Sequence, residues 1–119
     1  MPSLIERFGL GLAGSHPDIF AGPAEPNSRL YHLRRFYYDT ANSCNPVQLQ
    51  GLKTIVGASQ IIFGSDWPMG QPTGGVATTM SPAKQLKGLS TCGFSAGELA
   101  GVHRGNAAAR LFPRLNGNA

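Results

Sequence analysis

Two carboxylates in this chain directly follow apolar runs of the kind that form buried strands. Asp66 lies in the segment Gly64-Ser65-Asp66-Trp67-Pro68, just after the apolar run Gln60-Ile61-Ile62-Phe63. Asp39 comes at the end of the aromatic run Phe36-Tyr37-Tyr38. In α/β enzymes, a carboxylate at the carboxyl end of a strand is well placed to bind a metal ion or to accept a proton. We therefore take Asp66 and Asp39 as the first candidates for a functional site.

Each candidate also has a structural interpretation. Asp66 precedes Trp67-Pro68, and Asp-x-Pro is common turn chemistry, so Asp66 is either a functional carboxylate or a turn residue. Asp39 either approaches a substrate and braces the site, or caps the turn that follows it. Trp67 either lines a pocket for an aromatic substrate or packs in the interior. Arg34 and Arg35 either bind a substrate carboxylate or carry surface charge.

The elements around the two carboxylates predict a parallel pair of strands. A strand is expected over 36–39, because this run is aromatic, short and followed by turn residues. A second strand is expected over 60–63, because this run is apolar on both faces, as in a sheet covered by helices. Between them, Asn45 and Pro46 are typical of a helix start, and Gly57 is typical of a helix end. The apolar stripe within this segment predicts a helix from Pro46 to Val56. Strand, helix and strand in this order favour a parallel sheet or barrel, with both carboxylates at one edge.

Further helices are expected on either side of this unit. The predicted helices cover 2–12, 27–34, 82–89, 95–102 and 107–112. Ser95 and Glu98 have the spacing of a capping box at the start of one helix. Gly105 and Asn106 are expected to break the helix and to cap the next one, which Pro113 ends. The segments 15–27 and Met69–Ser81 are rich in Gly or Pro and are predicted to be loops.

Composition excludes several classes of protein. The chain has 119 residues, enough for one domain, with 41% hydrophobic and 13% charged residues and a net charge of +4. Its basic residues are scattered, which argues against a nucleic-acid partner. It contains no run of about 18 apolar residues and no signal peptide, so neither a membrane span nor secretion is expected, and the cytoplasm is the expected compartment. Cys44 and Cys92 form no metal-binding spacing and are expected to be free thiols.

Three motifs together resemble one enzyme family. They are Phe36-Tyr37-Tyr38-Asp39-Thr40-Ala41, then Ile62-Phe63-Gly64-Ser65-Asp66-Trp67-Pro68, and finally Arg104-Gly105-Asn106-Ala107 with Leu111-Phe112-Pro113. Their order and spacing resemble the C-terminal part of the amidohydrolase-related family, within the metal-dependent amidohydrolase superfamily. This branch includes aminocarboxymuconate-semialdehyde decarboxylase. The tyrosine-rich strand and the GSDWP motif look most similar to aromatic-acid decarboxylases such as those acting on 6-methylsalicylate.

The resemblance implies a partial (β/α)8 TIM barrel, with residues 1–119 as its C-terminal part. Strands 36–39 and 60–63 would be family strands 7 and 8, with flanking helices. A complete barrel of this kind has about 250 residues. In the family, a divalent metal, most commonly Zn²⁺, is held by a His-x-His after strand 1 and by histidines after strands 5 and 6. His16, His32 and His103 match none of these positions, so Asp66 is the only metal ligand and catalytic residue carried over.

The resemblance thus implies a fragment of a metal-dependent hydrolase or carboxy-lyase acting on a small carboxylated aromatic or related acid. One carboxylate does not hold zinc by itself, so the chain alone is expected to bind no metal and to be inactive. In the complete enzyme, Asp66 would be metal ligand and proton acceptor, while Trp67 and Asp39 would lie near the substrate. The alternative is a non-catalytic binding or assembly module derived from the barrel. Its unpaired strand would associate with a second copy or with an N-terminal fragment.

Overall fold

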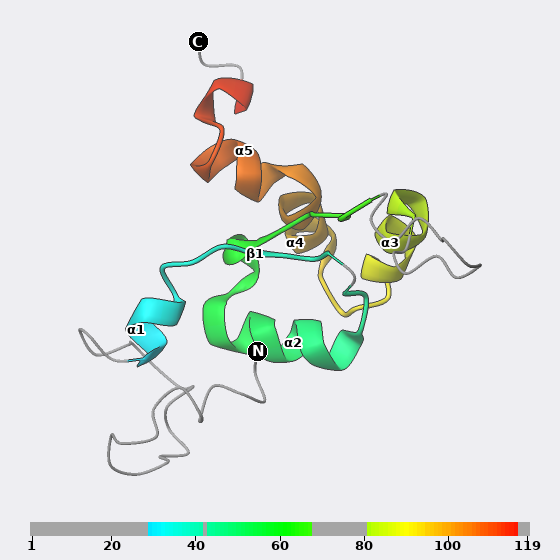
Figure 1. Cartoon of the computed structure of the whole chain (residues 1–119), viewed down its shortest axis with the longest axis horizontal. Helices are drawn as coiled ribbons and strands as arrows, with labels where there is room; N and C mark the ends of the chain where they lie inside the picture. The colour runs from blue at the N-terminus through cyan, green and yellow to red at the C-terminus, as the bar shows by residue number, and fades with distance from the viewer. Residues whose placement is uncertain (1–28, 42, 68–80, 117–119) are drawn as a thin grey trace, which may run out of the picture.

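The protein is a mixed α/β chain, mostly helical, with one two-stranded parallel sheet. The computed structural model describes residues 29–41, 43–67 and 81–116 (Figure 1). The predicted helix 2–12, the predicted loop 15–27 and all but Ser81 of the predicted loop Met69–Ser81 lie outside these residues. The elements in chain order are α1 (Arg29–Leu33), β1 (Tyr38–Asp39), α2 (Pro46–Val56), η4 (Ala58–Gln60), β2 (Ile61–Ile62), α3 (Pro82–Leu89), α4 (Ala96–Ala100), η5 (Gly101–Gly105), α5 (Asn106–Arg110) and η6 (Pro113–Asn116).

The parallel pairing expected from the sequence is confirmed. Tyr38 lies opposite Ile61 and Asp39 lies opposite Ile62, and the Thr40 N–H continues the ladder to the Ile62 carbonyl at 3.1 Å. The helix α2 connects the two strands and runs beneath them in the view of Figure 1. The chain thus has the strand–helix–strand order of a βα repeat.

Both strands are shorter than the predicted runs 36–39 and 60–63. The Phe36 N–H bonds to the Leu33 carbonyl in the turn after α1, so this residue is not part of the ladder. Gln60 belongs to the 3₁₀ turn η4, and its side-chain amide donates to the carbonyls of Arg34 and Phe36. These turn contacts use the backbone and side-chain groups at the start of each run, which leaves two paired residues per strand.

The helix α2 begins and ends at the residues that the sequence predicted. The Asn45 side chain accepts hydrogen bonds from the N–H groups of Val47 and Gln48, and Pro46 occupies the first turn. Gly57 ends the helix with φ 82°, a left-handed conformation that glycine adopts without steric cost. Its N–H bonds to the Lys53 carbonyl at 2.8 Å. Local chemistry therefore sets both ends of α2.

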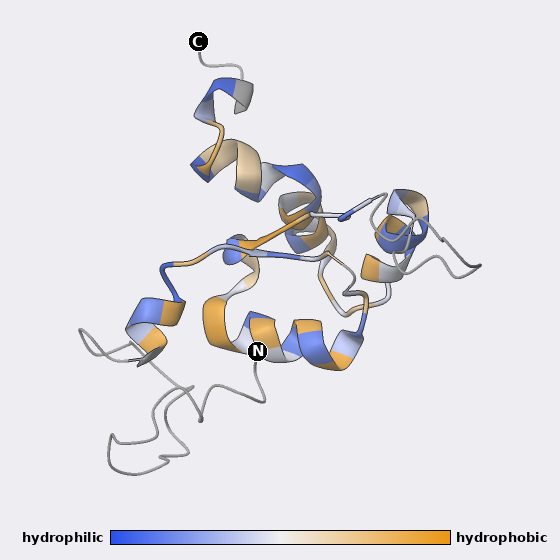
Figure 2. Cartoon of the chain, viewed as in Figure 1, coloured by the Kyte–Doolittle hydropathy of each residue, from blue (hydrophilic) through white to orange (hydrophobic). Residues whose placement is uncertain are grey.

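The core lies between α2, β2, α3 and η5. Apolar residues recur along α2 between polar ones, as Figure 2 shows. Ile61, Leu89, Cys92 and Val102 have no solvent exposure. The buried apolar cluster consists of Leu30, Leu49, Ile55, Val56, Ile61, Leu89, Cys92 and Val102. Segments far apart in the sequence therefore share one core around β2.

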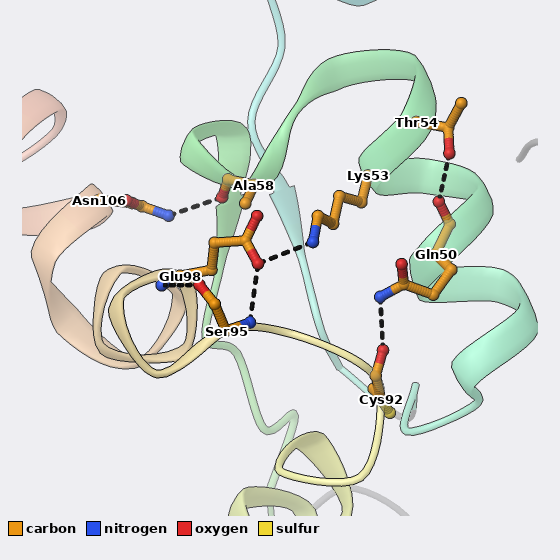
Figure 3. A network of polar contacts seen from close by, with 8 residues as sticks. All are labelled: Gln50, Lys53, Thr54, Ala58, Cys92, Ser95, Glu98 and Asn106. Atoms are coloured by element: carbon orange, nitrogen blue, oxygen red, sulfur yellow. Dashed lines mark hydrogen bonds and ion pairs between the residues drawn. The ribbon is translucent and has the colours of Figure 1, made fainter.

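The predicted capping box starts α4. The Ser95 hydroxyl accepts the Glu98 N–H at 3.2 Å, and the Glu98 carboxylate accepts the Ser95 N–H at 2.8 Å (Figure 3). Lys53 of α2 also binds this carboxylate at 2.7 Å. The hydrogen bonds from Lys53 and from the Ser95 backbone hold the pKa of Glu98 below its usual value. The stabilisation from these contacts is consequently lost as the pH falls through the folded pKa.

The predicted break at Gly105 and Asn106 is wrong. Gly105 has helical angles, φ −58° and ψ −42°, and the helical backbone continues from α4 through the π-helical turn η5 into α5. The Asn106 N–H bonds to the Gly101 carbonyl, five residues back, as in a π-turn. The Asn106 side chain does not cap the helix, and its Nδ2 donates instead to the carbonyls of Ala58 and Ile61. A contact with β2 thus replaces the predicted cap.

The last helix is shorter than the predicted 107–112. It ends at Arg110: the Leu111 N–H closes the last α-helical turn on the Ala107 carbonyl, and the Phe112 N–H bonds to the same carbonyl, five residues back. Pro113 then starts a separate 3₁₀ turn. Among residues 29–67 and 81–116, setting Asn42 aside, there is no helix of the length and apolarity required to cross a bilayer.

Both cysteines are free thiols, as expected, and both contact the C-terminal half of α3. The Cys92 thiol donates to the Gly88 carbonyl at 3.3 Å, and the Cys44 thiol donates to the Gln85 carbonyl at 3.3 Å. Burial raises the pKa of both thiols, and the neighbouring Cys92 raises the pKa of Cys44 further. A thiol with a raised pKa carries little of the nucleophilic thiolate at neutral pH.

We therefore expect Cys44 and Cys92 to react slowly in the folded protein. A disulfide reagent at neutral pH should modify them about tenfold or more slowly than in the urea-unfolded chain. Because both pKa values are raised by folding, the free energy of unfolding should decrease as the pH rises above the usual thiol value of 9.0. Equal rates of modification in the folded and unfolded chain would contradict this prediction.

Candidate functional site

Asp39 lies at the carboxyl end of β1, against the chain that leaves β2. A Cβ atom on Gly64 would be only 2.9 Å from Asp39 Cβ and 3.2 Å from its Cγ, so the close approach requires glycine. One oxygen of the Asp39 carboxylate, Oδ1, accepts the Ala41 N–H at 3.0 Å. Asp39 therefore both caps the turn after β1 and packs against the segment that carries Asp66.

A buried polar cluster joins the carboxyl ends of the two strands. Thr40 and Gln85 are fully buried. The Gln85 amide nitrogen donates to the Thr40 carbonyl, to Thr40 Oγ1 at 3.1 Å and to the Gly64 carbonyl at 2.6 Å. The Gly64 N–H donates to Thr40 Oγ1 at 3.3 Å. A side chain of α3 thus connects the residue after β1 to the residue that starts the GSDWP segment.

Gln85 was not among the sequence candidates, although the sequence contains a signal for it. It lies four residues before Leu89, which is fully buried, so both residues share one face of α3. A polar residue in line with a core leucine indicates a buried hydrogen-bond donor or acceptor. Its partners lie 45 and 21 residues away in the sequence and could not be identified from the pattern.

Asp66 lies beyond the carboxyl end of β2 in an unusual backbone conformation. Its φ is 53°, the left-handed region, and no other non-glycine residue described here has a positive φ. Aspartate tolerates this region better than most residues, and such conformations concentrate at functional sites. Asp66 and Trp67 are both exposed, and residue Trp67 is 46% accessible. The Trp67 N–H donates to Ser65 Oγ at 3.3 Å, which helps to shape the turn.

The parallel pairing places both carboxylates after strand ends at the same edge of the sheet. Asp39 is level with Ile62 in the register, and Asp66 follows Ile62 by four residues. The structure thus agrees with the expected order of carboxylates and strands. The roles of Asp66, Trp67 and Asp39 as site residues remain predictions.

The arginines and histidines among the described residues have structural contacts. Arg34 donates from Nε to the Ile55 carbonyl at 2.8 Å, near the C-terminus of α2. The Arg35 guanidinium lies 5.5 Å from the centre of the Tyr31 ring. His103 is exposed, and its ring meets the Phe63 ring edge-on at 6.5 Å. These contacts are structural, and none of them joins Arg34, Arg35 or His103 to Asp39 or Asp66.

The described residues do not form a metal site by themselves. Within 29–41, 43–67 and 81–116, no three His, Cys, Asp or Glu side chains converge in a way that could hold a metal ion. Zinc sites in proteins normally have three or four protein ligands. Asp66 could therefore contribute to a metal site only together with ligands from elsewhere.

No family model matches the sequence, and no match was found among curated proteins or solved structures.

Proposed function

We propose that this chain is the C-terminal part of a metal-dependent barrel enzyme of the amidohydrolase-related type. The observation that supports this best is the β1–α2–β2 unit, in which Asp66 lies four residues beyond the second parallel strand and has a left-handed backbone. In barrels and open α/β sheets alike, active sites lie at the carboxyl ends of the strands. In this proposal, β1 and β2 correspond to strands 7 and 8 of the family barrel, and the enzyme acts in the cytoplasm.

The proposal gives the residues of this chain distinct tasks. Asp66 is a ligand for a divalent metal, Zn²⁺, whose other ligands are histidines outside this chain. Trp67 offers an exposed aromatic face to a substrate at the same edge. Asp39 acts as a brace, because it packs against Gly64 and accepts the Ala41 N–H. The described residues do not hold the metal alone, so we derive no reaction step that passes through it.

The reaction class and substrate rest on the family resemblance. It implies hydrolysis or non-oxidative decarboxylation of a small carboxylated aromatic or related acid. The exposed Trp67 ring beside Asp66 suits an aromatic substrate, because aromatic rings stack on one another. Asp39 is not suited to bind the substrate carboxylate, since two negative charges repel.

The second candidate is an assembly or binding module, and the edges of the sheet favour it. Among the described residues β1 pairs with β2 alone, which leaves its outer edge without a strand. The far edge of β2 is already occupied, since Phe63 donates to the Val102 carbonyl and the Ile61 carbonyl accepts from Asn106. A barrel that closes through this edge of β2 would have to break both bonds. The outer edge of β1, in contrast, can accept a strand from another polypeptide.

Activity assays on two lengths of the protein test the proposal. We expect the 119-residue chain, supplied with Zn²⁺ or Mn²⁺, to release no CO₂ from 6-methylsalicylate and related hydroxybenzoates. A version extended by the reading frame upstream of Met1, if that frame encodes a His-x-His and the missing strands, should show turnover. Asp66→Ala should abolish this turnover, while Glu98→Gln, which changes a carboxylate in the capping box of α4, should preserve it.

Three outcomes would count against this proposal. Turnover by the 119-residue chain that disappears in Asp66→Ala would show that the chain is not an inactive fragment. Full turnover of Asp66→Ala in the extended protein would remove Asp66 from the site. An upstream stop codon, together with stable association of the chain with itself, would favour the assembly module.

A further inference from the structure

A cleft of about 390 Å³ lies beside β1, separate from Asp66. Its walls come from Tyr37, Tyr38 and Asp39 on one side and from Leu49 and Leu52 of α2 on the other. Ser43 and Gln48 complete the lining. Small-molecule sites in proteins have volumes of about 300 to 1,000 Å³ and combine apolar walls with a few polar groups. Both the size and the lining of this cleft fit that description.

Asp39 gives the cleft a negative charge, and the described residues that line the cleft include no cation. The side chains that line the cleft with Asp39 are neutral at pH 7. The ion pair recorded in the described part of the chain joins Lys53 to Glu98 and does not involve Asp39. The Asp39 carboxylate uses Oδ1 to accept the Ala41 N–H, and its second oxygen accepts no hydrogen bond from the described residues. This oxygen is a ready acceptor for a charged donor.

The other walls suit the rest of an organic cation. Tyr37 lies just before β1 and Asp39 ends it, and both residues line the cleft. The face of a tyrosine ring attracts an ammonium group, and the partly exposed Leu52 offers apolar surface to its carbon body, with the buried Leu49 beneath. Tyr38 stays neutral, because burial raises its pKa, and its hydroxyl donates to the Leu33 carbonyl at 3.0 Å.

We propose that this cleft binds a small organic cation, a primary amine on a short aromatic or apolar body. The ammonium group contacts the Asp39 carboxylate and the Tyr37 ring, and the body lies against Leu52 of α2. The cation site is distinct from the proposed acid substrate, because Asp39 repels anions and Asp66 does not line the cleft.

Binding of three isosteric probes tests the proposal. Phenethylamine, phenethyl alcohol and phenylacetate share one ring and a short chain but differ in charge, and each is titrated into the full chain while backbone amide NMR shifts are recorded. We expect the amine to shift the signals of residues 37–39, 43 and 48, and to bind about tenfold more tightly than the alcohol. The acid should cause no saturable shifts there.

Two variants test the contributions of the charge and of the ring separately, and a third variant serves as a control. Asp39→Asn keeps the Oδ1 acceptor for the Ala41 N–H but removes the charge, so the amine should bind about tenfold more weakly. Tyr37→Leu keeps an apolar wall without the ring face and should weaken the amine more than the alcohol. Glu98→Gln, which lies outside the cleft, is the matched charge control and should leave the affinity unchanged. Equal binding of amine and alcohol, unaltered amine affinity in Asp39→Asn, or the absence of shifts at 37–39 would each overturn the proposal.

Discussion

Replacement of Gln85 by leucine is expected to lower the free energy of unfolding by about 1 to 3 kcal/mol. The amide nitrogen of this fully buried side chain donates to the Thr40 and Gly64 carbonyls, and leucine would leave both without that donor. The other amide atom, Gln85 Oε1, is buried and accepts no hydrogen bond from the described residues. Leucine lacks this atom, so the cost of burying it disappears in the variant. We therefore expect the decrease in the free energy of unfolding to be smaller than the sum of two lost hydrogen bonds. Urea unfolding followed by far-ultraviolet circular dichroism measures the difference.

Gln85→Glu adds a pH-dependent test of the same contact. At neutral pH a carboxylate would face two carbonyl oxygens and destabilise the protein more than leucine does. In mild acid the protonated carboxyl regains one donor, so stability should partly recover as the pH falls. Burial raises the pKa of a carboxyl group, which places this recovery above the ordinary glutamate value of about 4.3.

The matched control for Gln85 lies on the same helix. Lys87→Leu changes an exposed position two residues further along α3 and should alter stability by less than about 0.5 kcal/mol. If Gln85→Leu changed the free energy of unfolding as little as Lys87→Leu does, the buried cluster would not hold the strand ends together. Stability of Gln85→Glu that stays flat between neutral and mildly acidic pH would lead to the same conclusion.

Local signals made α2 and the strand order predictable. Asn45, Pro46 and Gly57 each act on the helix that they flank, so their residue types reveal where it begins and ends. The parallel pairing followed from two apolar runs around one amphipathic helix, since this order is typical of βα units. The same pattern placed Asp39 and Asp66 after the strand ends, although it could not establish what either carboxylate does.

Contacts between distant segments were not predictable from the sequence. Gln85 and Asn106 bond to carbonyl groups of β2 or its flanks, and any polar residue type would have fitted the local helical pattern. The sequence around Asn106 favoured a cap, because asparagine after glycine often starts a helix. Packing against β2 changes the outcome, since the exposed carbonyls of the strand edge need donors more than the continuous helix needs a cap.

Asn106 covers the edge of β2 that faces away from β1, and its replacement is expected to expose that edge. Its Nδ2 donates to the Ala58 carbonyl at 2.8 Å and to the Ile61 carbonyl at 2.7 Å (Figure 3 shows the first contact). Asn106→Leu leaves the Ile61 carbonyl without its side-chain donor, whereas the Ala58 carbonyl keeps the Ile61 N–H. The free energy of unfolding should therefore fall by about 1 to 3 kcal/mol. Asn106→Asp should cost more at neutral pH, because a carboxylate would face two carbonyl oxygens.

Hydrogen exchange distinguishes the opening of this edge from a general loss of stability. The Phe63 N–H bonds to the Val102 carbonyl in η5, one turn before Asn106, so release of the helix from β2 exposes this proton. We expect the Phe63 amide of Asn106→Leu to exchange faster than the global change in stability explains, while amides inside α2 follow the global change. Arg110→Gln, at an exposed position of α5, is the matched control and should leave the Phe63 amide protected. If the protection of the Phe63 amide fell only as much as that of the α2 amides, Asn106 would stabilise the whole fold without covering this edge in particular. The edge of β2 would then be as accessible to a new strand as the edge of β1.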